Sequence, residues 1–151
     1  ANVRPVPLMP ILEAVAINHE ASAEARDLNL HVHPSSLWVQ SDSQLLSRIL
    51  SNLVSNAVRY TRTGRIIVGV RRRGEKIEIQ VWDTGIGITE DHLPHLFQEF
   101  YQVENPERDS SKGLGLGLSI VKAIIEAHGG RVKAQSDGKN LGSTFSFSIP
   151  L

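Results

Sequence analysis

Two amide side chains and an arginine recur at helical spacing in the middle of the chain. On a helix, Asn52, Asn56 and Arg59 would lie within about 60° of one another. The amide oxygen of Asn56 can bind Mg²⁺, which keeps several waters and takes phosphate oxygens as further ligands. Arg59 can pair with a phosphate, and the ring of Tyr60 can pack against adenine. An ordinary helix with a polar edge would carry the same residues, so both interpretations stay open.

A carboxylate followed by two glycines forms a second candidate element, Asp83-Thr-Gly-Ile-Gly87. Asp83 ends a β-branched run, where it can accept a hydrogen bond from an exocyclic amine such as that of adenine. Gly85 and Gly87 allow the main chain to pass close to a base. A plain turn uses the same residue types, so this motif alone does not decide between a turn and a base-binding site.

A third element is rich in glycine and leads into a helix: Gly113-Leu114-Gly115-Leu116-Gly117-Leu118. Free N–H groups at the start of a helix bind anions such as phosphates. The run lacks the Gly-Lys-Ser/Thr ending of a Walker A loop, and it follows no strand as a dinucleotide-binding loop would. A flexible hinge is the alternative. Together, the three elements indicate a site for a nucleotide and its metal.

The stretch before the glycine-rich run, residues 84–113, has little regular pattern, which in a compact domain usually indicates function. Phe97 and Phe100 lie in it, and they can either anchor the loop to the core or seat a lid that closes on a ligand. Lys112 or Arg108 is the candidate to reach a phosphate.

Composition limits the classes of function. The 151 residues suffice for one domain with a core, and 16 basic residues balance 16 acidic ones. This balance argues against a nucleic-acid surface, and the basic run 71–73 is interpreted as a solvated hairpin end. The chain has no cysteine, which excludes disulfides and thiolate metal sites, and it has no apolar run near the roughly 20 residues that span a bilayer. We therefore expect a cytoplasmic domain, without direct membrane contact, cut from a longer protein.

Hydrophobic periodicity predicts the elements that must position these residues. Helices are expected at 10–27, 42–60 and 116–128, the second opened by a capping box from Ser41 to Gln44. Strands are expected at 3–8, 30–33, 38–40, 65–72, 76–83, 131–135 and 143–149. A turn at 34–36 joins the second and third of them, residues 73–75 join the fourth and fifth in a hairpin, and the last two strands form a closing hairpin. These elements predict a two-layer α/β sandwich, with one mixed, mostly antiparallel sheet and helices on one face.

Taken in order, the motifs resemble the boxes of the ATP-binding domain of sensor histidine kinases. Residues 52–61 are similar to the N box, 83–87 to the G1 box, 96–101 to the F box and 113–121 to the G2 box, and 142–147 resemble the family's closing strand. The likeness covers the chain from about residue 8 to its end. It implies the Bergerat ATP-binding fold, which gyrase B, Hsp90 and MutL share, with a mobile ATP lid at residues 101–113.

The resemblance also implies the roles of individual residues. Asn52, Asn56 and Arg59 would be catalytic, with Asn56 holding Mg²⁺. The residues expected to bind ATP are Asn56, Arg59, Tyr60, Asp83, Gly85, Gly87, Ile88, Phe97, Phe100, Lys112, Gly113, Leu114, Gly115, Leu116, Gly117, Leu118 and Thr144. Relatives that hydrolyse ATP carry a glutamate at the position of Asn52. Because an amide is no general base, Asn52 favours transfer of the γ-phosphoryl group over hydrolysis.

The acceptor histidine is expected on another domain. His19-Glu20 lies on the first predicted helix, but the residues after it lack the basic residue and proline of the family's phosphoacceptor box, so His19 is interpreted as an ordinary helix residue. The expected partners are the dimerisation and phosphoacceptor domain of a parent kinase, which can be membrane-anchored, and the receiver domain of a response regulator. The alternatives are an ATPase or a protein-serine kinase of the same fold, or a docking module without catalysis.

Overall fold

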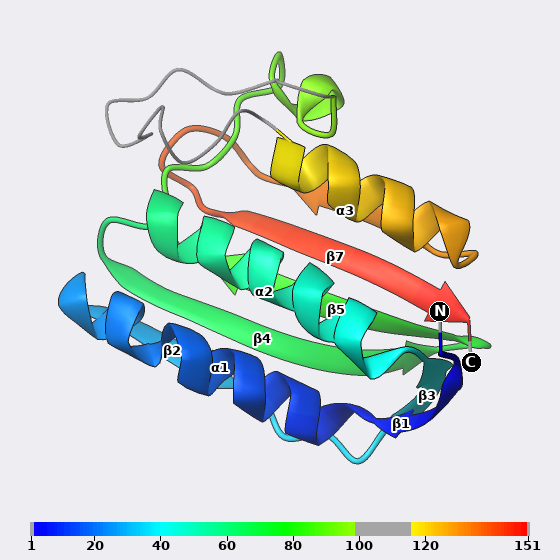
Figure 1. The fold of residues 1–151 in the computed structure, drawn as a ribbon. Helices are drawn as coiled ribbons and strands as arrows, with labels where there is room; N and C mark the ends of the chain where they lie inside the picture. The colour runs from blue at the N-terminus through cyan, green and yellow to red at the C-terminus, as the bar shows by residue number, and fades with distance from the viewer. Residues whose placement is uncertain (1, 99–115, 151) are drawn as a thin grey trace.

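The computed structural model describes residues 2–98 and 116–150, with side chains described from Leu118 in the second range. Its elements, in chain order, are β1 (Arg4–Pro7), α1 (Leu8–Ala25), β2 (Leu28–Val32), β3 (Trp38–Ser41), α2 (Ser43–Tyr60), β4 (Gly64–Arg73), β5 (Lys76–Asp83), the short helix η1 (Leu93–His95), α3 (Leu116–Ala127), β6 (Arg131–Gln135) and β7 (Ser143–Pro150) (Figure 1). None of the helices in these ranges is long and apolar enough to cross a bilayer.

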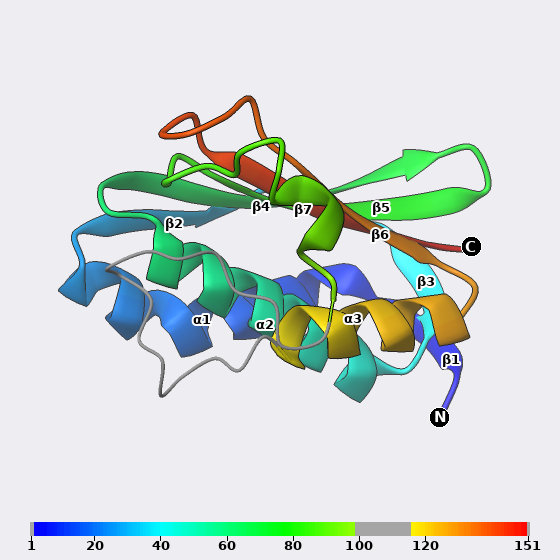
Figure 2. The ribbon, with the colours of Figure 1, turned by 90° about the horizontal axis from the view of Figure 1, so that it is seen from above.

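The main sheet has five strands in the order β2-β4-β5-β7-β6. β2 runs parallel to β4, and the other neighbouring strands are antiparallel. Seen from above in Figure 2, α1, α2 and α3 form one layer and the sheet forms the other. The expected two-layer α/β sandwich with helices on one face is therefore confirmed.

The core fills the space between these layers because residues alternate along each strand. In β5, Ile77, Ile79 and Val81 are buried toward the helices. On the facing side, α2 carries a buried stripe of apolar residues that recur every three to four positions, as in any amphipathic helix. That stripe consists of Leu46, Ile49, Leu50, Leu53, Val54, Ala57 and Val58. It holds α2 against the sheet and leaves the edges of the helix for polar residues.

The start of α2 differs from the expected capping box. Asp42, and not Ser41, is the N-cap, and its Oδ1 accepts hydrogen bonds from the N–H groups of Gln44 (2.9 Å) and Leu45 (3.3 Å). Ser41 is the last residue of β3 and is buried. Aspartate and serine are both good N-caps, so the pattern fixed the position only to within one residue.

The N-terminal region shows the largest differences from expectation. The expected strands 30–33 and 38–40 do not pair, because β3 pairs antiparallel with β1 in a separate two-stranded sheet while β2 joins β4. In that small sheet Val6 lies opposite Val39, and both are buried. The helix expected from residue 10 begins at Leu8, so Pro10 still lies in the first turn, where its missing N–H costs nothing.

His19 connects the first two helices. Its Nε2 lies 2.7 Å from the Oγ of Ser51 on α2, and partial burial lowers the pKa of the imidazole. The interpretation of His19 as a structural helix residue agrees with this contact.

Candidate functional site

A pocket opens where the C-terminal half of α2 faces the end of β5 and the beginning of β7. Its lining residues come from five segments that are distant in sequence: Asn56, Ala57, Tyr60, Asp83, Ile86, Gly87, Ile88, Leu96, Leu118, Ser143 and Phe145. The space among them, including the part open to solvent, is about 450 Å³. Most of the lining is apolar, and a few polar groups converge on it, which is the usual composition of a small-molecule site.

Asp83 is the buried charged group of this pocket. The residue is 5% exposed, its Oδ1 accepts a hydrogen bond from the N–H of Gly85 (2.8 Å), and its Oδ2 accepts one from the hydroxyl of Ser143 (2.8 Å). Burial raises the pKa of Asp83 above its ordinary value, and the hydrogen bonds from Ser143 and Gly85 only partly offset this rise. Both donors are neutral, so the carboxylate keeps an uncompensated charge that suits the amine of a ligand.

The two glycines after Asp83 pack main chain against main chain. A Cβ on Gly85 would lie 2.5 Å from the carbonyl oxygen of Tyr60, and the N–H of Ile86 donates to that same oxygen (3.1 Å). Gly87 has φ +71°, and a Cβ there would lie 1.9 Å from the carbonyl oxygen of Gly138. The expected close approach of Gly85 and Gly87 thus occurs toward neighbouring segments of the protein, and Gly87 also lines the pocket.

Some of the polar residues of α2 line the pocket and others lie outside it. Asn56 and Tyr60 line the pocket, whereas Asn52 is exposed one turn earlier and is not among the lining residues. The guanidinium of Arg59 lies over the ring of Tyr60, 5.7 Å from its centroid. This cation–π contact keeps Arg59 beside the pocket without placing it in the wall.

Other expected ligand-binding residues are distributed less uniformly. Ile88 and Leu118 line the pocket. Phe97 packs edge-to-face on Phe145, which does line it, with the ring centroids 6.3 Å apart. Leu116 and Gly117 form the first turn of α3. The expected lid at 101–113, with Arg108, Lys112 and Gly113, falls outside the described residues, and so do Phe100, Leu114 and Gly115.

Among the expected ligand-binding residues that the structure describes, Thr144 lies on the face of the sheet opposite the pocket. It lines a different hollow, on the face of the sheet opposite the helices, while its neighbour Ser143 bonds Asp83. Strict alternation along β7 explains this, since Ser143 and Phe145 share one face and Thr144 takes the other. Ser143 and Phe145 were not among the expected site residues, nor were Ala57, Ile86 and Leu96. The period of two in residues 143–149 was the signal that could have identified the first pair.

The described residues suit Mg²⁺ bound mostly through water and phosphate. Within the described ranges, no group of three or more His, Asp or Glu side chains could hold a metal on its own. Asn56 presents an amide to the pocket, and Mg²⁺ commonly uses one or two protein oxygens together with waters and substrate phosphates. This donor set therefore fits a metal that arrives with a nucleotide.

Comparisons with known proteins agree on one family. The model of the family described as "Histidine kinase-, DNA gyrase B-, and HSP90-like ATPase" matches residues 41–151. Sensor-like histidine kinase SenX3 of Mycobacterium bovis is 35% identical over 151 residues, covering 99% of this chain and 37% of its own. Sensor histidine kinase CusS of Escherichia coli is 39% identical over 132 residues, covering 87% of this chain and 27% of its own. The chain thus spans well under half of these relatives.

Solved structures show the same similarity. The catalytic domain of histidine kinase ThkA, in a nucleotide-free form, has a TM-score of 0.83 at 27% identity, covering 99% of this chain and 96% of that one. Full-length ShkA in complex with AMPPNP has a TM-score of 0.85 at 26% identity, covering 99% of this chain and 31% of that one. A complex of ThkA with the response regulator TrrA has a TM-score of 0.80 at 26% identity, covering 98% and 41%.

Proposed function

Because the chain belongs to the histidine kinase-, DNA gyrase B- and HSP90-like ATPase family and has the fold of a histidine kinase catalytic domain, we propose that its pocket binds ATP with Mg²⁺ for transfer of the γ-phosphoryl group to a histidine on another domain. The observation that carries this proposal is Asp83, a buried carboxylate with neutral donors in an apolar pocket. Such a group accepts a hydrogen bond from the exocyclic amine of adenine, which guanine lacks at that position.

Different residues of the pocket would contact the base, the metal and the phosphates of ATP. Ile86, Ile88 and Leu118 offer apolar contacts to the base, and Tyr60 offers a flat ring. Asn56 would hold the metal, which when bound neutralises charge on the phosphate oxygens. Arg59, held beside the pocket on the ring of Tyr60, would pair with a phosphate. The base thus lies at the Asp83 end and the phosphates toward α2.

Transfer is favoured over hydrolysis by the chemistry of Asn52. An amide cannot take a proton from water, so the site lacks a general base at that position. Phosphoryl transfer needs mainly positioning and charge neutralisation. The γ-phosphorus would form a bond to an imidazole nitrogen of the partner domain. Its bond to the oxygen that bridges the β- and γ-phosphates would break, and ADP would be released. By analogy with ThkA, whose complex with a response regulator is known, a receiver domain would then take the group.

Nucleotide titration tests the proposal. A fluorescent ATP analogue should bind this chain saturably, and removing Mg²⁺ should weaken binding. Asn56→Ala should abolish the Mg²⁺ dependence, while Asn18→Ala, the same change on an exposed position of α1, should leave it intact. The absence of saturable binding at millimolar nucleotide, or equal behaviour of the two variants, would refute the assignment.

The acceptor requires a separate measurement. When the chain is mixed with the phosphoacceptor domain of its parent kinase and labelled ATP, the label should appear on that domain as an acid-labile phosphoramidate. Acid-stable label would instead indicate a serine kinase, and release of free phosphate without a labelled protein would indicate an ATPase.

A further inference from the structure

The face of the five-stranded sheet that points away from the helices is a polar surface with a strong excess of positive charge. Its residues are identified by alternation, since their neighbours in β4–β7 pack into the core. Figure 2 shows that α1, α2 and α3 all lie on the opposite side of the sheet. We call it the outer face, and its use is not explained by the nucleotide pocket on the other side.

The strand register arranges the outer face in rows that cross the sheet. One row contains Arg71, Glu78, Ser148 and Arg131, each opposite the next. The next contains Gly69, Gln80, Ser146 and Lys133, and a third contains Ile67, Trp82, Thr144 and Gln135. Small side chains on β7 therefore lie between the cations of β4 and those of β6. We call Arg71, Arg73, Arg131 and Lys133 the basic strip.

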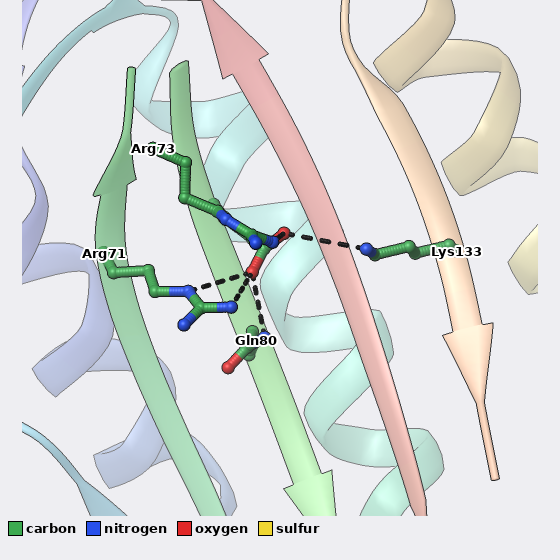
Figure 3. Close-up of polar contacts among 5 residues, drawn as sticks. Arg71, Arg73, Gln80 and Lys133 are labelled. Carbon is green, nitrogen blue, oxygen red and sulfur yellow. Dashed lines mark hydrogen bonds and ion pairs between the residues drawn. The ribbon is translucent and has the colours of Figure 1, made fainter. Parts of the chain in front are cut away.

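Glu78 organises the basic strip but neutralises little of it. Its side chain is 7% exposed and pairs with Arg71 (3.2 Å), Arg73 (3.1 Å) and Lys133 (3.9 Å), whose side chains are 52–56% exposed. Figure 3 shows Arg71 and Arg73 on one side and Lys133 on the other, all directed toward the same centre. With Arg65 and Lys76, the outward positions carry six cations against this one carboxylate, although the whole chain is balanced.

An apolar corner adjoins the basic strip. Trp82 is 37% exposed, with the guanidinium of Arg65 5.6 Å from its ring centroid, and Leu141 is 65% exposed. Both line a hollow of about 550 Å³, together with Gln135, Ser136, Asp137, Gly142, Ser143 and Thr144. We call it the outer hollow. Its exposed tryptophan is the kind of residue that serves as an anchor at protein interfaces, and the leucine adds apolar surface beside it.

We propose that the outer face docks an acidic segment of a partner protein, which sets its carboxylates on the basic strip and an apolar side chain in the outer hollow. Charge complementarity supports this occupant, because Arg71, Arg73 and Lys133 keep about half of their side-chain surface exposed after pairing with Glu78, and Arg131 is exposed as well. A carboxylate-bearing segment also matches the planar guanidinium groups of Arg71 and Arg73.

Other occupants fit less well. Glu78 at the centre of the cations and Asp137 in the wall of the hollow interrupt the positive charge, which suits a segment with spaced carboxylates better than the continuous phosphates of a nucleic acid. A second copy of the chain carries the same cations on its own outer face, so it would have to bind through a different surface in a heterologous contact.

A binding experiment with a defined probe tests the proposal. The probe is a labelled peptide of glutamates with a single central leucine, titrated at low ionic strength. Arg131→Gln with Lys133→Gln removes two charges of the strip and should weaken binding about tenfold. Arg48→Gln with Lys122→Gln removes two exposed charges from α2 and α3 and should change it by less than about twofold.

A second readout locates the peptide. In a Trp38→Phe background Trp82 is the remaining tryptophan, and its emission should change when the peptide binds. Leu141→Ser, or serine in place of the leucine in the peptide, should weaken binding about threefold to tenfold through lost apolar burial. ATP affinity of every variant should stay unchanged, so this result does not depend on the nucleotide site.

Four outcomes would overturn the proposal. The first is an equal loss of peptide affinity in the two double variants, and the second is a Trp82 emission that does not change when the peptide binds. The third is binding of phosphatidylglycerol vesicles or polyphosphate that is tighter than peptide binding and requires the basic strip. The fourth is self-association, measured by sedimentation, that the substitutions in the basic strip remove.

Discussion

Two buried carboxylates on the same strand, Asp83 and Glu78, face opposite sides of the sheet and are handled in opposite ways. Asp83 lies toward the helices, receives hydrogen bonds only from neutral groups, and burial raises its pKa. For Glu78 burial acts in the same direction, but hydrogen bonds from Arg73 and Arg71 and the charges of Arg73 and Lys133 outweigh it and lower the pKa.

The difference separates a group kept for a ligand from a group used by the fold. Neutral donors orient the Asp83 carboxylate without compensating its charge, which costs stability and leaves an acceptor for an incoming amine. Cations saturate Glu78, so a ligand has nothing to gain from it. Burial alone would have identified both residues as candidates, and the nature of the partners distinguishes them.

The largest expected effect is on ATP affinity in Asp83→Asn. The amide places a donor where the carboxylate accepts, and losing a hydrogen bond to a charged group should cost about thirtyfold in affinity. Titration with a fluorescent ATP analogue measures it. Asp27→Asn, an exposed residue at the end of α1, is the matched control and should bind normally. An Asp83→Asn variant that binds ATP as tightly as the parent chain would break the distinction.

Glu78→Gln should reverse this pattern, with lost stability and normal ATP affinity. Removing the charge leaves Arg71 and Arg73 without their buried partner, but both are about half exposed, so the cost is about 1 kcal/mol. The urea midpoint at constant m-value measures the change. Glu75→Gln, on the exposed hairpin, should change the midpoint little. Weaker ATP binding in Glu78→Gln would contradict the separation of the two faces.

Lowering the pH should abolish ATP binding before it unfolds the protein. ATP binding needs the ionised Asp83, so affinity falls as the pH drops through its raised pKa. The stability that Glu78 supplies is full above its unfolded-state pKa and is lost only as the pH falls through its lowered folded-state value. For stability, Asp83 has the opposite sign, because its raised pKa favours the folded state at low pH and loses that contribution as the pH rises.

Affinity and urea midpoint measured over the same acid series check this order. The Asp83→Asn variant separates titration of the carboxyl group from titration of the nucleotide, because its residual binding should lack the same acid midpoint. Coincident loss of binding and of structure would show that the two carboxylates are not independent.

The smallest expected effects come from two serines on β7. Ser143→Ala removes a hydrogen bond to Asp83 and should weaken ATP binding about fivefold. Ser146 is 1% exposed on the other face, and its hydroxyl has no hydrogen-bond partner among the described residues, so Ser146→Ala should leave affinity unchanged and stability equal or slightly higher. Equal effects of the two substitutions on ATP affinity would sink the comparison.

Local pattern was enough to predict the elements that hold the pocket. The apolar stripe of α2 and the β-branched runs of β4 and β5 gave their positions to within one or two residues. Asn56, Tyr60 and Asp83 could be singled out because their residue types match nucleotide chemistry. Ser143 was missed because motif similarity selected Thr144, whereas the alternation of β7 decides which of the two faces the pocket.

Long-range pairing could not be predicted in the same way. Nothing local indicates that β3 pairs with β1 and that β2 joins β4 in parallel, since those choices depend on packing across the whole domain. The run 71–73 was interpreted as a solvated hairpin end, yet Arg71 and Arg73 pair with Glu78. A lone glutamate in an alternating strand is expected to be exposed, and only the three surrounding cations make its burial tolerable.

Ser143 lines both the nucleotide pocket and the outer hollow, so a wall one residue thick divides them. The N–H of Gly142 donates to the carbonyl oxygen of Gly85, and that of Asn140 donates to the carbonyl oxygen of Ile86. These two bonds join the loop before β7 to the loop after β5. If two ligands bind on the two sides of this wall, their effects on each other's affinity are reciprocal. Any factor by which the nucleotide changes the affinity for a ligand in the outer hollow is also the factor by which that ligand changes the affinity for the nucleotide. Measuring either member of this thermodynamic cycle therefore yields both.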